Sequence, residues 1–531
     1  MAVAPALNND NIQGNILAGF NKDFQSFLFV TFPSGADPRG WLAEIAGDVA
    51  TTAEVEAFNA LFKQIAHRRG QELGTVEATW MNVALSASGL AAVGVPSAEL
   101  EQFDASFQAG MKARAADIGD VGPNAPEHWQ APLGSTDVHA VVLLAADDRD
   151  DLDEAVLRNI DHMSRHGLCL AFRQDGRARS DLPGHEHFGF KDGVSQPGIR
   201  GITEPNPGNP NEGQPGQDLL WPGEFVLGYP TQKGHTTPPP PIPGPPNYGH
   251  EEAAPAVSTS EVPPEPGPDS VNGPPWAADG SYLVFRRLAQ DVPAFNQFVA
   301  QTAAAEQRPE ALIGAKLVGR YKSGCPLEVP RDKPEGFDTQ TADPSIADSS
   351  LLSDQEINDF EYDRDGDGAI VPRAAHIRKA YPRNEATPGG GEADTQTHRL
   401  LRRGIAYGEP FDIGAPAGTP HGGDADRGLL FLCYQRSIVD QFEFVQRLWV
   451  NNPNFPQRGD GQDLIIAQEA VTREFTAPGL QEPQLQIGQF VRTTGGEYFF
   501  QPSISALERL SHDGHITDAG GGQPFRATSN A

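Results

Sequence analysis

The sequence predicts an α+β protein made of two folded halves that a proline-rich segment joins. Apolar runs typical of strands alternate with amphipathic helical patterns in both halves of the 531-residue chain. The connections are long, and no glycine-rich strand–turn–helix begins a dinucleotide-binding unit, which disfavours a single doubly wound parallel sheet. In addition, 20 of the 47 prolines fall within residues 204–275, where neither a helix nor a central strand is expected.

The N-terminal half, which we assign to residues 1–203, begins with a turn-like segment at 11–21. Strands are expected where short runs of Phe, Val and Leu stand between turn residues. One long helix is expected because Leu152, Val156 and Ile160 recur on one side. In chain order the predicted elements are a strand at 27–32, helices at 38–47 and 52–67, strands at 80–85 and 138–145, a helix at 150–166 and a strand at 168–172.

The C-terminal half, residues 276–531, repeats this alternation of strands and helices. Its predicted elements are a strand at 282–286, a helix at 292–306, a strand at 429–434 and a helix at 438–450. The connection between the halves, residues 204–275, includes the proline run 238–241. We expect it to be irregular, in part polyproline II, and to act as a spacer.

The charge balance and the cysteines exclude several classes of protein. With 40 Lys and Arg against 71 Asp and Glu, the net charge of −31 at pH 7 disfavours nucleic acids and anionic membranes as partners. No apolar stretch approaches the roughly 20 residues of a membrane span, and no secretory signal is recognised, so a cytoplasmic protein is expected. Cys169, Cys325 and Cys433 are odd in number and far apart, which disfavours a disulfide scaffold and an iron–sulfur cluster.

Three segments hold charged residues in contexts that suggest chemistry. They are HEHFGFKDGVSQP at 185–197, RAAHIRKAYPR at 373–383 and HRLLRRGIAYG at 398–408. Taken alone, each has a plain structural interpretation: Asp192 in a turn, His376 on a solvated basic face, and Arg402 and Arg403 in an ion pair at a strand edge. A histidine among cations also suits haem, which has two propionates and takes an axial imidazole.

Two other patterns are typical of metal sites. The run DRDGDG at 363–368 matches the first half of an EF-hand loop, but its twelfth position is Ala374 instead of the bidentate Glu. An acidic turn is therefore favoured, and calcium binding is left open. His162 and His166 have the i, i+4 spacing of a zinc pair, although a helix-end pair that interacts with the helix dipole is the favoured interpretation.

Together and in this order, the three charged segments resemble the dye-decolourising peroxidases, a haem peroxidase family. Residues 189–193 match the family's G-x-x-D-G signature, AAHIRK around His376 resembles its proximal-ligand segment, and RRGIAYG at 402–408 resembles its distal-arginine segment. Further similar segments are IQGNILAGFNKD at 12–23, GLLFLCYQ at 428–435 and GQDLIIAQ at 461–468. The resemblance covers most of the chain, and the long insertions resemble the larger members of the family. The sequence departs from the family pattern at Tyr381, where Asn is common, and at Ala406, where Pro is common. Neither is a reacting position, so these departures affect only details at the haem edge.

The resemblance implies two ferredoxin-like halves, each an antiparallel β-sheet with flanking helices, and one haem b per chain held mainly by the C-terminal half. His376 would be the iron ligand, with Asp463 accepting a hydrogen bond from its ring. Asp192 and Arg402 would be the catalytic pair on the distal side, and Arg403 is the alternative if the register is off by one. The other implied site residues are Arg378 and Arg383 at the propionates, His187 near the haem, Leu429 and Phe431 in the distal wall, and Tyr407 as an electron relay.

The activity that the resemblance implies is reduction of hydrogen peroxide and oxidation of dyes, phenolics or similar one-electron donors through a ferryl intermediate. A carboxylate would move the peroxide proton and a guanidinium would stabilise the anionic oxygen. Two other classes stay open: a non-catalytic haem carrier or iron-release protein on the same fold, and an acidic calcium-binding protein. Trp449 is a second candidate relay, although packing is its favoured role. The physiological reductant and the oligomeric state are left open.

Overall fold

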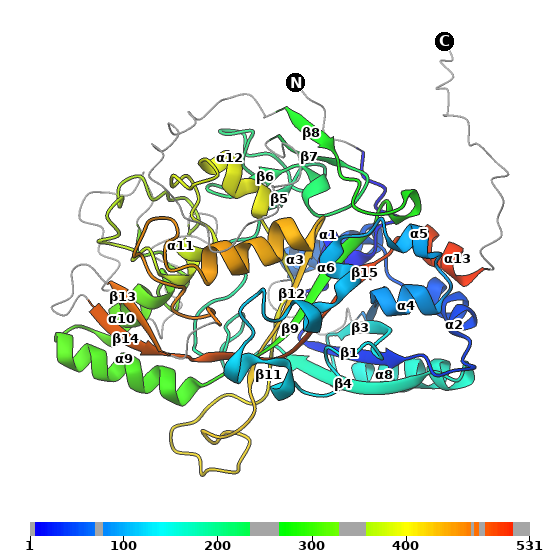
Figure 1. Cartoon of the computed structure of the whole chain (residues 1–531), viewed down its shortest axis with the longest axis horizontal. Coiled ribbons are helices and arrows are strands. Elements are labelled where there is room, and N and C mark those ends of the chain that lie inside the picture. The colour runs from blue at the N-terminus through cyan, green and yellow to red at the C-terminus, as the bar shows by residue number, and fades with distance from the viewer. Residues whose placement is uncertain are drawn as a thin grey trace.

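The computed structural model describes residues 6–69, 78–233, 265–328, 357–468, 472–476 and 484–512. Within them, a nine-stranded sheet forms the centre of the molecule, and helices cover it (Figure 1). The strands lie in the order β10-β12-β9-β15-β2-β3-β1-β4, and β11 also pairs with β12. Every pairing within this sheet is antiparallel.

The N-terminal half has the ferredoxin-like β-α-β-β-α-β order. Its strands lie in the spatial order β2-β3-β1-β4. The elements in chain order are β1 (Phe24–Thr31), α3 (Thr52–Arg69), β2 (Trp80–Leu85), β3 (Ala140–Ala146), α8 (Arg149–Arg165) and β4 (Cys169–Arg177). The prediction of a ferredoxin-like fold is therefore confirmed for this half.

The C-terminal half repeats that order of strands and helices. The elements are β9 (Ser281–Gln290), α9 (Val292–Glu306), the short strands β10 (Leu401–Arg402) and β11 (Ile405–Tyr407), β12 (Gly428–Gln435), the π-type helical turns η8 (Ile438–Glu443) and η9 (Val445–Val450), and β15 (Val491–Gln501). Their spatial order, β10-β12-β9-β15, matches that of the first half. The two halves join where Phe500 of β15 lies opposite Leu85 of β2.

Shorter elements surround this framework. The remaining helices are α1 (Gly14–Leu17), α2 (Pro38–Ile45), α4 (Ala87–Ala92), α5 (Ser97–Leu100), α6 (Ala105–Ala109), α7 (Met111–Arg114), α10 (Glu310–Val318), α11 (His376–Ala380), α12 (Glu392–Thr395) and α13 (Ile504–Ser511). The remaining strands are β5 (Gly198–Ile199), β6 (Leu219–Leu220), β7 (Pro230–Gln232), β8 (Pro266–Asp269), β13 (Thr472–Thr476) and β14 (Gln484–Gly488). None of the described helices is both long and apolar enough to cross a membrane.

Both faces of the central sheet are buried, because successive side chains of a strand point to opposite sides. In β1, Leu28 and Val30 belong to one apolar cluster, whereas Phe27 and Phe29 belong to a second. A strand with two buried faces is apolar throughout, which explains why β1 and β3 are recognisable in the sequence. By contrast, β4 lies at the sheet edge and continues through residues 173–177, which are polar or glycine, so its sequence pattern predicts only its first part.

The described parts of the proline-rich connection are folded onto the body of the protein. Trp221, Phe225 and Val226 are at most 2% exposed, and Phe225 and Val226 pack in the cluster that contains Phe27 and Phe29. These described parts have only short strands, β6, β7 and β8, and they contribute to the core, whereas a spacer was expected. The proline run 238–241 lies outside the described residues, and the boundaries at 203 and 276 stay a prediction.

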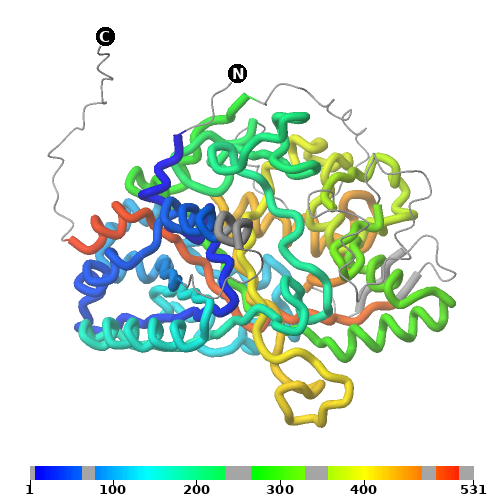
Figure 2. Tube along the Cα trace, turned by 180° about the vertical axis from the view of Figure 1, so that it is seen from behind, coloured from blue at the N-terminus to red at the C-terminus, as the bar shows by residue number. Residues whose placement is uncertain are grey.

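One loop extends away from the body. It joins β11 to β12, residues 408–427, and is the yellow segment that projects below the molecule in Figures 1 and 2. Ile413 within it is 92% exposed. The site described below includes Arg402 of β10 and Leu429, which lies near the start of β12.

We expect Phe500→Ala to destabilise the whole protein by about 3–5 kcal/mol, since it removes a fully buried ring at the join between the halves. Its ring contacts those of Phe103 and Tyr282, at centroid distances of 5.0 and 5.5 Å. Chemical denaturation measures the change. The control, Leu157→Ala, alters a side chain that is 67% exposed and should stay within about 0.5 kcal/mol. Two separate unfolding transitions in the wild type would contradict a jointly stabilised sheet.

Candidate active site

A cavity of about 260 Å³ lies at the C-terminal half of the sheet, and residues from distant parts of the chain line it. The lining comes mainly from three stretches, 186–195, 376–383 and 398–404, together with β9, β12 and the η8–η9 helix. Much of the wall is apolar: Leu429, Phe431, Val450 and Ile465 all contribute. The cavity therefore combines hydrophobic walls with a small number of charged groups.

His376 is the first residue of α11 and lines this cavity. Its Nδ1 lies 2.9 Å from Oδ2 of Asp463, whose side chain is fully buried. The other carboxylate oxygen of Asp463 accepts the backbone N–H groups of Ile465 and Ile466, both at 2.8 Å. The carboxylate is thus held rigidly and fixes the orientation of the imidazole ring. Its Nδ1–H donates a hydrogen bond to Asp463, and Nε2 is the nitrogen suited to bind a metal.

The same contact governs the charge of His376. Burial opposes the protonated ring, but the adjacent Asp463 carboxylate outweighs burial and raises the pKa of His376 above its ordinary value of 6.5. Conversely, the protonated imidazole and the two N–H donors outweigh burial at Asp463 and lower the pKa of its carboxyl. The pair is therefore a strongly polarised hydrogen bond inside an otherwise apolar region.

Asp192 and Arg402 meet at another part of the cavity wall. The Arg402 Nη1 lies 3.4 Å from Oδ1 of Asp192, and the side chains are 30% and 34% exposed. This contact is long for a charge-assisted hydrogen bond, so both groups retain room for a further partner. The backbone of Arg402 is fixed by the amide of Gln196, which accepts its N–H at 3.2 Å and donates to its carbonyl at 3.0 Å.

The loop that carries Asp192 is held by a buried carboxylate. Glu186 accepts the backbone N–H groups of Phe188 and Phe190, both at 2.8 Å, and the side-chain amide of Gln290 at 2.5 Å. Burial raises the pKa of Glu186 despite these donors. Gly189 adopts a φ of 91° between the two donors, a conformation that is strained for a residue with a side chain. The glycine of the motif therefore permits the turn that presents Asp192.

In the part of the chain that the structure describes, two buried arginines of the cavity wall have no carboxylate partner. Among the described residues, the Arg320 guanidinium donates to Gly324 O, Ile357 O and Asn358 Oδ1, and that of Arg383 donates to Asn358 O and Phe360 O. Burial, and then the nearby Arg383 charge, lower the pKa of Arg320 to about 9. Buried cations without anions are costly, so this part of the wall favours an anionic ligand.

These groups fit haem. Its apolar ring suits the walls formed by Leu429 and Phe431, its propionates suit Arg320 and Arg383, and its iron suits the Nε2 of His376. Sequence analysis missed Arg320, because a single arginine after a helix has no local signature of a ligand. Only its burial beside Arg383 identifies it.

Six of the expected site residues line the cavity: Asp192, His376, Arg383, Arg402, Leu429 and Phe431. Arg403, the alternative to Arg402, does not, since its guanidinium donates to the carbonyls of Asn15, Ile16 and Leu17. Asp463 lies directly behind His376.

Three expected site residues lie elsewhere. His187 is not part of the lining; its Nε2 contacts the Tyr407 carbonyl at 2.8 Å, and burial lowers its pKa to about 4. Tyr407 is 3% exposed and lies under the guanidinium of Arg287, outside the cavity. Arg378 is fully buried between Asp365 and Glu385, which corrects the expectation that it contacts a propionate.

The histidine pair at 162 and 166 does not form a zinc site in the part of the chain that the structure describes. His166 Nε2 lies 2.8 Å from Glu44 Oε2, and His162 Nδ1 lies 3.8 Å from the other oxygen. No group of three or more suitable metal ligands occurs among the described residues. The pair instead connects the end of α8 to α2.

Comparison with protein families gives two matches in chain order. Residues 11–180 match the DyP dimeric alpha+beta barrel domain, and residues 258–457 match the C-terminal domain of Dyp-type peroxidases. Dye-decolorizing peroxidase msp1 of Mycetinis scorodonius is 32% identical over 95% of this chain and 88% of its own length. Multifunctional dye peroxidase DyP2 of Amycolatopsis sp. is 30% identical over 94% of this chain and 95% of its own length.

Solved structures give the same result. An ancestral D-type dye decolorizing peroxidase superposes with a TM-score of 0.75 and 30% identity over 96% of this chain and all of its own. AauDyP complexed with imidazole superposes with a TM-score of 0.72 and 29% identity, again over 96% of this chain and all of its own. A more limited similarity, 30% identity over 33% of this chain and 28% of the relative's length, links the protein to a deferrochelatase of Yersinia pestis.

We expect Asp463→Asn to lower the pKa of His376 in the cofactor-free protein, because burial then acts without the opposing carboxylate. In the wild type the folded-state pKa is raised, so the charged pair stabilises the fold below pH 6.5, and this contribution is lost as the pH rises through the folded-state pKa. Histidine NMR titration of both proteins measures the shift. The His187 signal is the internal control, and an unchanged His376 titration would contradict the assignment.

Proposed function

The chain belongs to the dye-decolourising peroxidase family and is a haem peroxidase of that kind; on this premise we propose that it binds one haem b per chain through His376 and reduces hydrogen peroxide with Asp192 and Arg402. A single observation supports the proposal most directly. One cavity is lined by a carboxylate–guanidinium pair and by an imidazole whose other nitrogen is held by a buried carboxylate, although these residues are far apart in the sequence.

Four further residues would hold the cofactor. Arg320 and Arg383 would neutralise the propionates, since both line the cavity and neither forms an ion pair with a described carboxylate. Leu429 and Phe431 would contact the porphyrin ring and restrict the space beside it. When bound, the haem supplies the redox chemistry, because its iron accepts oxidising equivalents from peroxide and passes them to one-electron donors.

Asp192 and Arg402 divide the work on peroxide. The Asp192 carboxylate takes the proton from one peroxide oxygen and returns it to the other, which leaves as water. The Arg402 guanidinium binds the peroxide anion and stabilises the negative charge that develops as the oxygen–oxygen bond breaks. The long contact between the two side chains leaves room for a small molecule to bind to both. Asp463 makes the His376 imidazole a stronger electron-pair donor by accepting a hydrogen bond from its Nδ1–H.

The proposed reductants are dyes and phenolic compounds. One solved relative is a dye-decolorizing peroxidase in complex with 2,6-dimethoxyphenol. Donors too large for the cavity require an electron route through the protein, and the candidates are Tyr407 and Trp449. Trp449 is 2% exposed and packs edge-on against His398, which lines the cavity, whereas Tyr407 is separated from the lining. These contacts favour Trp449 over Tyr407 as the residue that would relay electrons.

A haem carrier or iron-release protein is the alternative, and the partial similarity to deferrochelatase is the observation that favours it. A carrier needs the axial histidine and the arginines but has no use for a proton-transferring carboxylate paired with a second guanidinium. Peroxide-dependent dye oxidation by the reconstituted chain separates the two functions.

We expect Asp192→Asn and Arg402→Leu each to slow the peroxide-dependent change of the haem spectrum by about 10²–10⁴-fold. Because both groups serve one step, the double variant should lose less than the product of the single losses. Stopped-flow absorbance against peroxide concentration measures the rates after haem content is equalised. Asp412→Asn and Arg158→Leu are controls outside the cavity. If neither Asp192→Asn nor Arg402→Leu slows the step, the carrier function becomes the better explanation.

We expect His376→Ala to lose most of its haem on reconstitution of the full chain, since the proposed axial ligand is gone. Absorbance and EPR spectra measure haem content and ligation. His421→Ala is the matched control, because His421 is exposed and, among the described residues, its side chain hydrogen-bonds only to the Pro410 carbonyl. A His376→Ala protein with native spectra would rule out the ligand assignment.

A further inference from the structure

The acidic run at 363–368 forms a loop around its central residue. Asp365 is 1% exposed, and its two carboxylate oxygens accept the backbone N–H groups of Ile370 and Val371 at 2.8 and 2.7 Å. Such a loop is folded around a carboxylate in the manner of a cation-binding turn, which explains its similarity to half of an EF-hand. Its carboxylate, however, already has a cation.

That cation is the guanidinium of Arg378, which is fully buried within α11. Its Nη1 donates to Asp365 Oδ2 and Val371 O, its Nη2 donates to Asp365 O and Glu385 Oε1, and its Nε donates to Glu385 Oε2, all at 2.8–2.9 Å. The guanidinium also lies 4.5 Å from the centroid of the Tyr362 ring. All five N–H donors of Arg378 are therefore satisfied by three residues, two from the Asp365 loop and Glu385.

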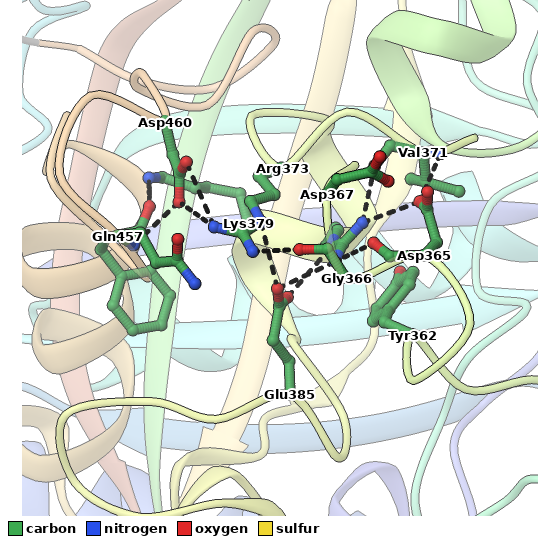
Figure 3. Close-up of polar contacts among 12 residues, drawn as sticks. Tyr362, Asp365, Gly366, Asp367, Val371, Arg373, Lys379, Glu385, Gln457 and Asp460 are labelled. Atoms are coloured by element: carbon green, nitrogen blue, oxygen red, sulfur yellow. Dashed lines mark hydrogen bonds and ion pairs between the residues drawn. The ribbon is translucent and has the colours of Figure 1, made fainter. Parts of the chain in front are cut away.

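The network continues through Arg373 to Asp460, as Figure 3 shows, and Asp460 stands three residues before Asp463 in the chain. Arg373 lies between Glu385, at 3.4 Å, and Asp460, also at 3.4 Å, and it donates to the carbonyl of Gly366. In α11, directly after Arg378, Lys379 donates hydrogen bonds from Nζ to the carbonyls of Asn452 and Phe455. The helix with His376 and the segment with its partner Asp463 are thus tied to one set of charges.

We propose that the Asp365 loop is a receptor for the Arg378 guanidinium, and that Arg378 is a positioning residue that holds the His376 helix against Asp463. The inference rests on the proposed role of His376 as axial ligand. A helix of five residues has little stability of its own, so its orientation depends on tertiary contacts. The planar fork of Arg378 fixes that orientation in a way that a point charge does not. In this proposal, the cation that the EF-hand-like loop binds is the Arg378 guanidinium, not calcium.

The central experiment compares Arg378→Lys and Asp365→Asn with two controls from the same loop, Arg364→Lys and Asp367→Asn. Arg364 and Asp367 are exposed, and Asp367 contacts only the N–H of Ala369 among the described residues. Hydrogen exchange of the peptide 374–381 is measured in the cofactor-free full chain. We expect exchange to accelerate about tenfold in the first two variants and not in the controls, because opening of the helix then breaks fewer contacts.

The second readout is spectroscopic and uses the haem-loaded protein. In the reduced enzyme, the iron–histidine stretching band should shift in Arg378→Lys and Asp365→Asn, and haem should dissociate about tenfold faster, as for other residues that orient a metal ligand. Both controls should match the wild type. Folded variants with an unchanged band and unchanged exchange would overturn the proposal, because the contact between Arg378 and the Asp365 loop would then have no effect on the His376 helix.

Chemical rescue keeps the test decisive if Arg378→Lys does not fold. Arg378→Ala is refolded with methylguanidinium, and with ammonium at the same concentration as the control. Restoration of slow exchange at 374–381 by methylguanidinium alone supports a guanidinium receptor. Equal effects of the two cations, or of neither, would overturn it. A wild type that fails to bind haem would refute the proposed function. The role of Arg378 could still be judged, because hydrogen exchange is measured without cofactor.

Discussion

The hydrogen bond from His376 Nδ1 to the buried Asp463 carboxylate is the interaction on which the site depends. It determines which ring nitrogen faces the cavity, and it keeps a charged pair inside an apolar region where neither charge would be stable alone. Because the two residues are 87 positions apart, the chain has to bring two separate segments together within hydrogen-bond distance. Much of the polar network in this half of the protein serves that end.

The two ferredoxin-like halves contribute unequally to the cavity. The C-terminal half supplies the imidazole, the guanidiniums of Arg320 and Arg383, and most of the apolar wall. The segment after β4, at the end of the N-terminal half, supplies the Asp192 loop. The continuous sheet through β15 and β2 explains how the halves share a site, since pairing and a common buried core hold them in one orientation.

Arginine is used in this protein in two ways that the sequence does not distinguish. Arg378 and Arg383 stand five residues apart in one basic segment, and both were expected at the propionates. The first has all of its donors satisfied by Asp365, Val371 and Glu385. The second lines the cavity, and in the described part of the chain its guanidinium donates hydrogen bonds to backbone carbonyls. The difference arises from which acidic residues the fold brings near each guanidinium. A local motif identifies the segment but not the role of each cation.

The sequence by itself predicted the class of fold and the family, and it indicated His376, Asp192 and Arg402 as candidate site residues, because strand and helix periodicity and short motifs are local properties. Only the tertiary structure decided that Arg320 belongs to the cavity, that Arg378, His187 and Tyr407 do not line it, and that the proline-rich connection contributes to the core. Burial, and the partner that a buried charge finds, depend on segments far apart in the chain, so no local pattern carries that information.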